Sequence, residues 1–289
     1  MFKHAAWSLV LALPLSLNAA PAHKILFFSK SSGFEHSVIS WKAGKPSLAD
    51  KVFLDLGAKH SWTFEFSKDG SKFTPEYLAG FDTVIFYTTG DLTTTGADGE
   101  PAITPQGKQA LFDYVKNGKG FIGLHSATDT FHTGKDSGLV PTDDKDAYIC
   151  MIGAEFIGHG NQQVATNKVT DPKFPGLASA GATFSFNEEW YSLKNFNPDL
   201  HAITVIDAPA MTGDDYNRPP YPTTWARQEG KGRIFYTAMG HRDDIWSNPV
   251  FQDILVGAIH WTTGDVKADI SPNLKTAAPE ATTNPQPKK

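Results

Sequence analysis

Cysteine is nearly absent from the chain: its 289 residues include one, Cys150. A single cysteine cannot close an internal disulfide or supply a CxxC metal pair, so a disulfide-stapled scaffold is excluded. Cys150 lies in the apolar run Tyr148-Ile149-Cys150-Met151-Ile152, which predicts a buried and inert thiol.

An excess of positive charge is also lacking. Lys and Arg number 26 against 31 Asp and Glu, the net charge is −5, and no basic block occurs, so we exclude nucleic acid as a partner. With 40% hydrophobic residues the chain can bury a real core, which excludes wholesale disorder. Its ten His, seven Trp and 12% aromatic content indicate a polar site lined by rings.

No apolar run near the N-terminus is long enough to form a stable membrane anchor. The run Ala5–Leu17 contains Pro14 and is too short to cross a hydrocarbon layer of about 30 Å. Lys3 precedes this run, small residues up to Ala22 follow it, and residues 1–22 contain no acidic side chain. This pattern predicts a signal peptide over residues 1–22 and therefore an exported protein, periplasmic or secreted.

Aromatic residues are missing from Thr262 onward, and prolines recur among Thr, Ala, Asn and Lys. Such a segment buries little, so we predict a disordered tail over residues 265–289. No repeat or linker divides the remainder, which predicts one domain over residues 23–264. The sequence does not fix the oligomeric state, and a homo-oligomer stays open.

Short apolar runs alternate with amphipathic helical patterns along the domain. Strands are predicted at Lys24–Ser29, Ser61–Phe66, Thr83–Tyr87, Gly120–Leu124, Ala202–Ile206 and Arg233–Thr237. Helices are predicted from Ser47 to Gly57, from the N-cap Thr104 to Gly118, and after Asn248-Pro249. Alternating strands and helices predict an α/β three-layer sandwich with a mostly parallel sheet. Residues 125–200 are less periodic and predict an elaborated loop region with local strands.

Histidines follow three of the predicted strands at the point where each strand ends. They are His36, His125 and His241, and His159 lies in a later loop. The carboxyl ends of parallel strands meet at one edge of a sheet, where ligands bind, so we expect these side chains to share a site. His23, His60, His201 and His260 flank apolar segments and are expected to be structural or surface residues.

The segment Gly123-Leu124-His125-Ser126-Ala127 has the layout of a nucleophile elbow, with His125 at the apex. Imidazole suits a metal ligand or a general base better than a nucleophile. The four histidines His36, His125, His159 and His241 are candidate ligands for one divalent metal such as zinc, although no HxH or HxxxH spacing supports it. Acid–base catalysis without metal stays open, and so does a triad of Ser126, His241 and Asp129.

Two carboxylates lie beside two aromatic rings in Asn187-Glu188-Glu189-Trp190-Tyr191. Carboxylates next to rings are typical of sugar recognition and of acid–base work on glycosides, and a charged surface turn is the alternative. We expect sugar-binding rings at Phe34, Trp190, Tyr191 and Trp225, the last of which fits the core equally well.

The order of these segments resembles the ThuA-like (trehalose-utilisation) family across nearly all of residues 24–262. The matching segments are Gly33–His36, Gly123–Asp129, Gly153–Phe156 with His159, Glu188–Tyr191, Thr224–Trp225, Gly230–Tyr236, Gly240–His241 and His260–Trp261. Glu188 departs from the Asp that members often have there, and Gly160 replaces a common Pro.

The resemblance implies a flavodoxin-like fold related to class I glutamine amidotransferases, with the elbow cysteine replaced. It also implies a place in carbohydrate catabolism, where relatives accompany dehydrogenases that make 3-keto-glycosides. Motif positions of the family are occupied by His36, His125, Asp129, His159, Glu189, Tyr191 and His241.

We therefore expect an exported hydrolase or lyase that acts on a small carbohydrate, either a disaccharide or an oxidised (3-keto) glycoside. Its catalytic residues would be His125, His241, Glu189 and Asp129. The alternatives are a non-catalytic carbohydrate-binding module and a serine hydrolase that uses Ser126.

Overall fold

The computed structural model of the chain describes residues 23–131 and 146–286. The predicted signal peptide, residues 1–22, lies outside the described residues. Within the described ranges, no helix combines the length and the apolar character needed to span a bilayer.

A nine-stranded sheet forms the centre of the molecule, with strands in the order β2-β1-β3-β4-β11-β10-β9-β6-β7. The neighbours from β2 to β11 are parallel, and those from β11 to β7 are antiparallel. The bounds are β1 Lys24–Phe28, β2 Thr63–Ser67, β3 Thr83–Phe86, β4 Gly120–Leu124, β6 Gln163–Val169, β7 Thr183–Glu188, β9 His201–Ile206, β10 Tyr221–Glu229 and β11 Gly232–Thr237.

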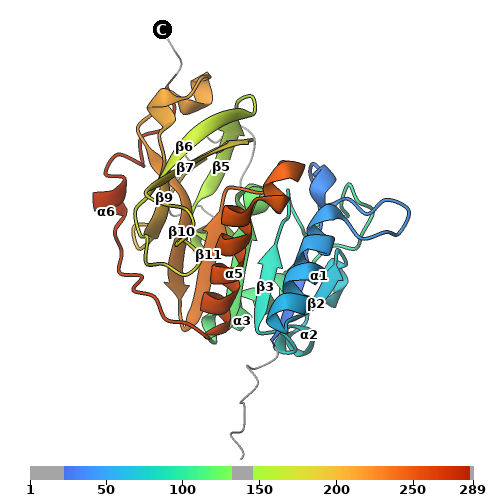
Figure 1. Cartoon of the computed structure of the whole chain (residues 1–289). Coiled ribbons are helices and arrows are strands. Elements are labelled where there is room, and N and C mark those ends of the chain that lie inside the picture. Colours follow the sequence, from blue (N-terminus) through green and yellow to red (C-terminus); the bar gives the residue numbers. More distant parts are fainter. Residues whose placement is uncertain (1–22, 132–145, 287–289) are drawn as a thin grey trace, which may run out of the picture.

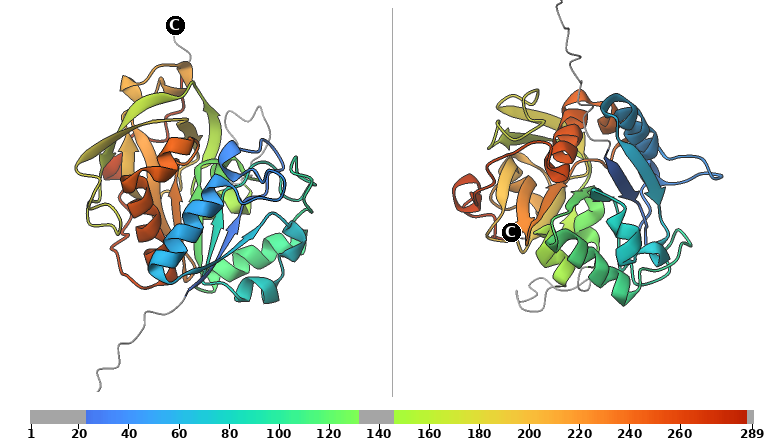
Figure 2. Two further views of the ribbon diagram at one scale, coloured as in Figure 1. Left: turned by 45° about the vertical axis from the view of Figure 1, so that its right-hand side comes forward. Right: turned by 90° about the horizontal axis from the view of Figure 1, so that it is seen from below.

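Helices cover both faces of the parallel half of this sheet (Figure 1). On one face lie α1 and α5, and on the other lie α2, α3 and α4, as the view from below shows (Figure 2). The bounds are α1 Leu48–His60, α2 Pro75–Ala79, α3 Pro105–Lys116, α4 Ala147–Ile152 and α5 Pro249–Thr263. The predicted three-layer α/β sandwich with a parallel sheet is confirmed.

Capping side chains start the helices where the sequence predicted them. The hydroxyl of Ser47 accepts the Asp50 N–H in a capping box, Thr104 caps α3, and Asn248 caps α5. The predicted end of α1 at Gly57 is wrong, because the helix continues to His60. Gly57 instead lets the helix approach β2, since a Cβ there would lie 2.8 Å from the Trp62 carbonyl oxygen.

The predicted strands are confirmed, and β3 and β4 are buried along their whole length, as continuous apolar runs predict. The irregular stretch after residue 125 holds α4, β6 and β7, together with a separate two-stranded sheet of β5 (Glu155–His159) and β8 (Tyr191–Lys194). The strand β10 was not predicted, and its first residues include Pro222 and two threonines. This strand lies between β11 and β9, where its buried face packs into the core.

The prediction of a disordered tail is wrong for residues 265–286. This segment runs along the outside of the sheet next to β9 and includes the short helix α6, Leu274–Ala277 (Figure 1). Leu274, Ala278 and Ala281 are buried, and Asn273 bonds both the N–H and the carbonyl of Ala202. Small aliphatic side chains and one amide therefore anchor a segment that has no aromatic residue.

The prediction that Cys150 is buried is also wrong. Cys150 lies on α4 and is exposed, whereas Tyr148, Ile149, Met151 and Ile152 are buried. A helix of this length at the surface turns one side chain outward even when its sequence is apolar throughout.

A network of charged groups lies at the other edge of the sheet, where β1 begins. His23 places its Nδ1 3.1 Å from Asp82 and its Nε2 2.8 Å from Asp265, which also binds His260 at 2.8 Å. Burial opposes the charge on His23, but the bonds to Asp265 and Asp82 prevail and raise its pKa. The same bonds lower the pKa of Asp82 and Asp265 against the opposing effect of burial. His23 thus has the structural role that its position predicted.

Candidate functional site

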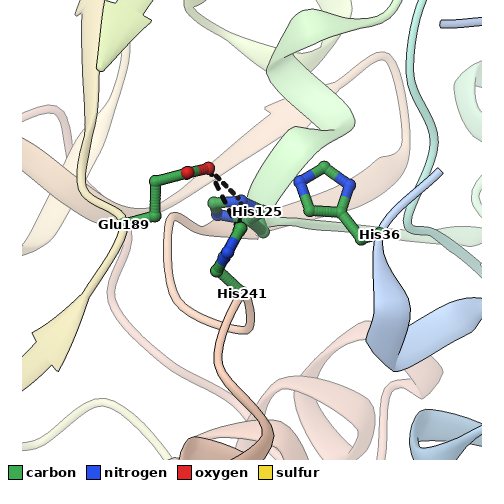
Figure 3. A group of neighbouring side chains, drawn as sticks. All are labelled: His36, His125, Glu189 and His241. Carbon is green, nitrogen blue, oxygen red and sulfur yellow. Dashed lines mark hydrogen bonds and ion pairs between the residues drawn. The ribbon is translucent and has the colours of Figure 1, made fainter. Parts of the chain in front are cut away.

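Three histidines and one glutamate meet at the carboxyl edge of the parallel strands. His36 follows β1, His125 follows β4 directly, His241 follows β11, and Glu189 lies in the short link between β7 and β8. Each offers one nitrogen or oxygen ligand atom, and these atoms all lie within 4.8 Å of one another. Figure 3 shows the four side chains pointing toward a common centre. The predicted convergence of the histidines from three strand ends is what the structure displays.

The distances within this cluster fit a small metal ion. The Oε2 of Glu189 lies 3.0 Å from Nδ1 of His241 and 3.5 Å from Nε2 of His125, and the two histidine nitrogens are 3.3 Å apart. Ligand atoms bound to one tetrahedral zinc at about 2.0–2.1 Å are about 3.3–3.4 Å from each other. The three donors already have nearly the spacing that such an ion requires.

The backbone of His125 is strained, with φ at +43°, in a region that L-residues rarely adopt. Tyr236 stabilises this conformation, because its hydroxyl donates to the His125 carbonyl at 2.7 Å and lies 3.1 Å from the Thr128 hydroxyl. Gly123 packs closely here, because a Cβ at this position would lie 2.7 Å from the end of the Ile152 side chain and 3.1 Å from the Tyr236 ring. The predicted sharp turn at the end of β4 is therefore present, with imidazole at its apex.

The tautomer of His125 follows from its neighbours. Its Nδ1 lies 3.0 Å from the carbonyl oxygen of Ala238, and because a carbonyl can only accept, Nδ1 carries the proton. Nε2 is the nitrogen that faces Glu189 and His241, and it is the atom that would bind a metal ion. Metal-binding histidines are commonly oriented by such a bond from the opposite nitrogen.

His36 is a neutral imidazole in this setting. Burial, and then the nearby His125 and His241, lower its pKa to about 2. Its Nδ1 is buried and has no hydrogen-bond partner among the described residues. Figure 3 shows one nitrogen of the His36 ring turned toward the other three side chains. A neutral ring can offer a lone pair from the nitrogen that faces the other three side chains, which suits His36 to bind a metal ion.

Glu189 and His241 form an ion pair at the centre of the cluster. Burial alone would raise the pKa of Glu189, but hydrogen bonds with His125 and His241 hold it well below its usual range. Burial would likewise lower the pKa of His241, but the bond to Glu189 raises it. Three imidazole nitrogens and a carboxylate oxygen are ligands that zinc accepts, so the residues present fit one divalent ion.

His159 differs from the other three histidines. Its Nδ1 lies 3.4 Å from Oε1 of Glu189, its side chain is 41% exposed, and it is not one of the four residues whose ligand atoms converge. The sequence predicted His159 as the fourth metal ligand. In the structure the fourth residue of the cluster is Glu189, which was expected to be catalytic. His159 instead lies at the open rim, with its ring stacked on Tyr191 at 5.8 Å.

Two of the four expected sugar-binding rings are in the core: the prediction for Trp190 is wrong, and Trp225 takes the core position that the sequence left open. Trp190 and Trp225 are fully buried, and their indole N–H groups donate to the carbonyls of Gln163 and Ile152. Burial leaves neither ring a face for a ligand.

The other two rings belong to the site. The Tyr191 ring is buried too, but it packs against the cluster itself, 4.2 Å from the His125 ring. Phe34 is 69% exposed, and its ring lies 5.0 Å from that of His36.

The proposed serine triad is not assembled in the part of the chain that the structure describes. Ser126 is buried, and its Oγ has no hydrogen-bond partner among these residues, so no histidine is placed to activate it. Asp129 lies outside the four-residue cluster, and its negative charge adds to the effect of burial in raising the pKa of Tyr191.

The role of Glu188 was not predicted from the sequence. Its buried carboxylate accepts the backbone N–H groups of Glu189, Gly240, His241 and Arg242 at 2.9–3.2 Å. Burial raises its pKa, while these bonds act in the opposite direction. The tandem Glu188-Glu189 was the available signal, but the sequence could not show that one carboxylate faces the cluster and the other faces the backbone behind it.

Similarity to known proteins covers most of the chain. A family model described as ThuA, trehalose utilisation, matches residues 24–262. A ThuA-like protein from Bacteroides uniformis superimposes with a TM-score of 0.66 at 20% identity, covering 91% of this chain and all of that one. A second, from Parabacteroides merdae, has a TM-score of 0.55 at 17% identity, with the same coverage of both chains. At these identities the likeness shows the fold, and no curated protein matches the chain.

Proposed function

Because the chain belongs to the ThuA family, whose model carries the description trehalose utilisation, we propose that it is an enzyme of carbohydrate catabolism. Its substrate in this proposal is a disaccharide or an oxidised (3-keto) glycoside, and the reaction is a hydrolysis or an elimination. The site is the cluster of His36, His125, Glu189 and His241, which would hold one divalent metal such as zinc.

The convergence of these four ligand atoms within 4.8 Å carries the proposal. A metal ion requires neutral imidazoles and an ionised carboxylate as ligands, and His36 and Glu189 already meet this requirement. His241 gives up its proton on binding the ion.

Once bound, the ion would polarise a carbonyl or hydroxyl oxygen of the substrate. The residues of the chain supply the rest. Phe34 exposes a ring beside His36 on which the apolar face of a sugar can stack. His159 lies at the rim, in contact with Glu189 and with solvent, where it can carry a proton between the substrate and water.

The burial of two tryptophan rings favours an enzyme over a non-catalytic carbohydrate-binding module. A binding module depends on exposed aromatic platforms, but Trp190 and Trp225 are buried in the core. The chemistry at the carboxyl edge is instead dominated by titratable groups. Such groups in perturbed protonation states are typical of catalytic sites.

The test is a screen of the purified protein against disaccharides and their 3-keto forms, with His125→Ala, His241→Ala and His60→Ala as variants. His60 stacks on Trp62 and takes no part in the cluster, so its variant is the matched control. The proposal expects activity that the two cluster variants lose, that His60→Ala keeps, and that a chelator removes and zinc restores. Full activity in either cluster variant would contradict it, and activity that survives chelation with a bell-shaped pH profile would replace the metal by acid–base catalysis.

We also propose that the chain is exported, because residues 1–22 combine a basic start, a short apolar run and a small-residue cleavage site. Sequencing of the N-terminus of the protein from the producing cells tests this. A start at His23 is expected, and an intact chain that begins at Met1 in the cytosol would contradict the proposal.

A further inference from the structure

Behind the cluster, one buried carboxylate joins the two segments that carry Glu189 and His241. Oε1 of Glu188 accepts the N–H of Glu189 at 3.0 Å and the N–H of Arg242 at 3.1 Å. Oε2 accepts the N–H of Gly240 at 2.9 Å and the N–H of His241 at 3.2 Å. The Glu188 carboxylate thus binds the backbone amides of two of the four ligand residues.

From this geometry we infer that Glu188 is a positioning residue that sets the affinity of the site for its metal ion. The inference rests on the proposed function, because it assumes that the cluster binds a metal. Glu188 does not reach the ion. It acts by fixing the backbone from which Glu189 and His241 project.

The segment 240–242 needs such an anchor, because its conformation is unusual. Gly240 has φ at +125°, which side-chain-bearing residues rarely adopt. Its carbonyl accepts bonds from the Tyr87 hydroxyl at 3.1 Å and from the Trp246 indole at 2.9 Å. These two bonds hold one side of the segment, and the Glu188 carboxylate holds the N–H groups on the other side.

A carboxylate suits this position better than an amide. Hydrogen bonds to an ionised acceptor are about twice as strong as neutral ones, and both oxygens of Glu188 accept two N–H groups. Glutamine would keep one oxygen but turn an NH2 group toward two N–H donors. The segment would then move away from the new donor and carry the His241 ring away from Glu189 and His125.

The experiment measures zinc affinity of the full chain by competition with a chromophoric chelator, in wild type, Glu188→Gln and Glu188→Asp. Loss of a group that orients metal ligands typically costs about 10- to 100-fold in affinity. We expect a loss in this range for Glu188→Gln and a smaller one for Glu188→Asp, which keeps both oxygens. The cobalt-substituted wild type should show a tetrahedral absorption spectrum that Glu188→Gln distorts.

The matched control is Glu155→Gln. Glu155 is equally buried, binds the Asn195 side chain at 2.7 Å and belongs to β5 rather than to the cluster. Glu155→Gln should lower the melting temperature, because it also replaces a buried carboxylate, but it should leave zinc affinity unchanged. Equal affinity in wild type and Glu188→Gln would overturn the inference, as would an equal loss in Glu155→Gln. A wild type that binds no zinc would instead overturn the proposed function.

Hydrogen exchange of the wild type keeps the inference testable if the Glu188 variants do not fold. The amides of residues 240–242 should exchange slowly in the zinc-free protein, because Glu188 already holds them. Fast exchange without zinc, and protection only after zinc is added, would show that the metal rather than Glu188 orders this segment.

Discussion

Replacing Tyr236 by Phe should weaken both the protein and its site. Tyr236 is fully buried, and the substitution removes one oxygen without removing the ring. The His125 carbonyl loses its 2.7 Å bond, and the Thr128 hydroxyl loses a 3.1 Å contact. The loss of these two hydrogen bonds, which leaves the buried His125 carbonyl without its best donor, should lower the free energy of unfolding by about 1–3 kcal/mol. In a domain of this size, that free energy corresponds to a fall in melting temperature of roughly 2–12 °C.

The consequence for the site follows from the strain at His125. A non-glycine residue held at positive φ stores about 1–3 kcal/mol, and the Tyr236 bond is one of the contacts that hold it there. Without that bond the turn relaxes and Nε2 moves away from Glu189 and His241. We expect zinc affinity to fall about 10-fold, as for other groups that orient metal ligands.

The assay is a thermal melt and a zinc titration of Tyr236→Phe and of Tyr114→Phe. Tyr114 also buries its hydroxyl and donates to a carbonyl, that of Phe81, but it lies on α3 away from the cluster. Both variants should melt earlier, and only Tyr236→Phe should bind zinc more weakly. Equal zinc affinity in the two variants would refute the link between this bond and the site, and an unchanged melting temperature in Tyr236→Phe would refute the energetic argument.

Contacts away from the site make three more properties testable. The raised pKa of His23 stabilises the fold below pH 6.5, and this stabilisation is lost as the pH rises through the pKa of His23 in the folded protein. The lowered pKa values of Asp82 and Asp265 stabilise the fold above pH 3.8, and this stabilisation is lost as the pH falls through the folded-state pKa values of the two carboxyls. His23→Ala should therefore lower the melting temperature at pH 5–6 by more than at pH 9, and an equal loss at both would contradict this. Leu274→Ala should cost about 2 kcal/mol or more, and an unchanged melting temperature would mean that the C-terminal segment does not pack. A thiol reagent should label Cys150 in the folded protein without loss of activity, and inactivation by the reagent would contradict the assignment of the site.

Much of the fold could be predicted from the sequence because its signals are local. Continuous apolar runs mark the buried parallel strands, and Ser47, Thr104 and Asn248 mark the helix starts. The resemblance to the ThuA family is likewise confirmed by the family match. The failed prediction of a disordered tail concerns contacts between distant segments. The order of the residues after 264 does not show that Asn273 meets Ala202.

The candidate site could be predicted in outline for a topological reason. Parallel strands bring the residues at their carboxyl ends to one edge of the sheet, so His36, His125 and His241 could be grouped from strand ends alone. Glu189 and His159 come from the irregular region, where no periodicity tells which side chain faces the cluster. For the same reason the sequence could not show that Trp190 points into the core while its neighbour Glu189 reaches the histidines.

The most direct test of the central claim is X-ray absorption at the zinc edge on the zinc-loaded wild-type protein, with the metal content measured on the same sample. We predict one zinc per chain with three imidazole nitrogens and one carboxylate oxygen as protein ligands, at about 2.0–2.1 Å. The histidine scattering should fall in His36→Ala. A protein that takes up no stoichiometric zinc, or a zinc shell without imidazole scattering, would contradict the assignment of His36, His125, Glu189 and His241 as a metal site.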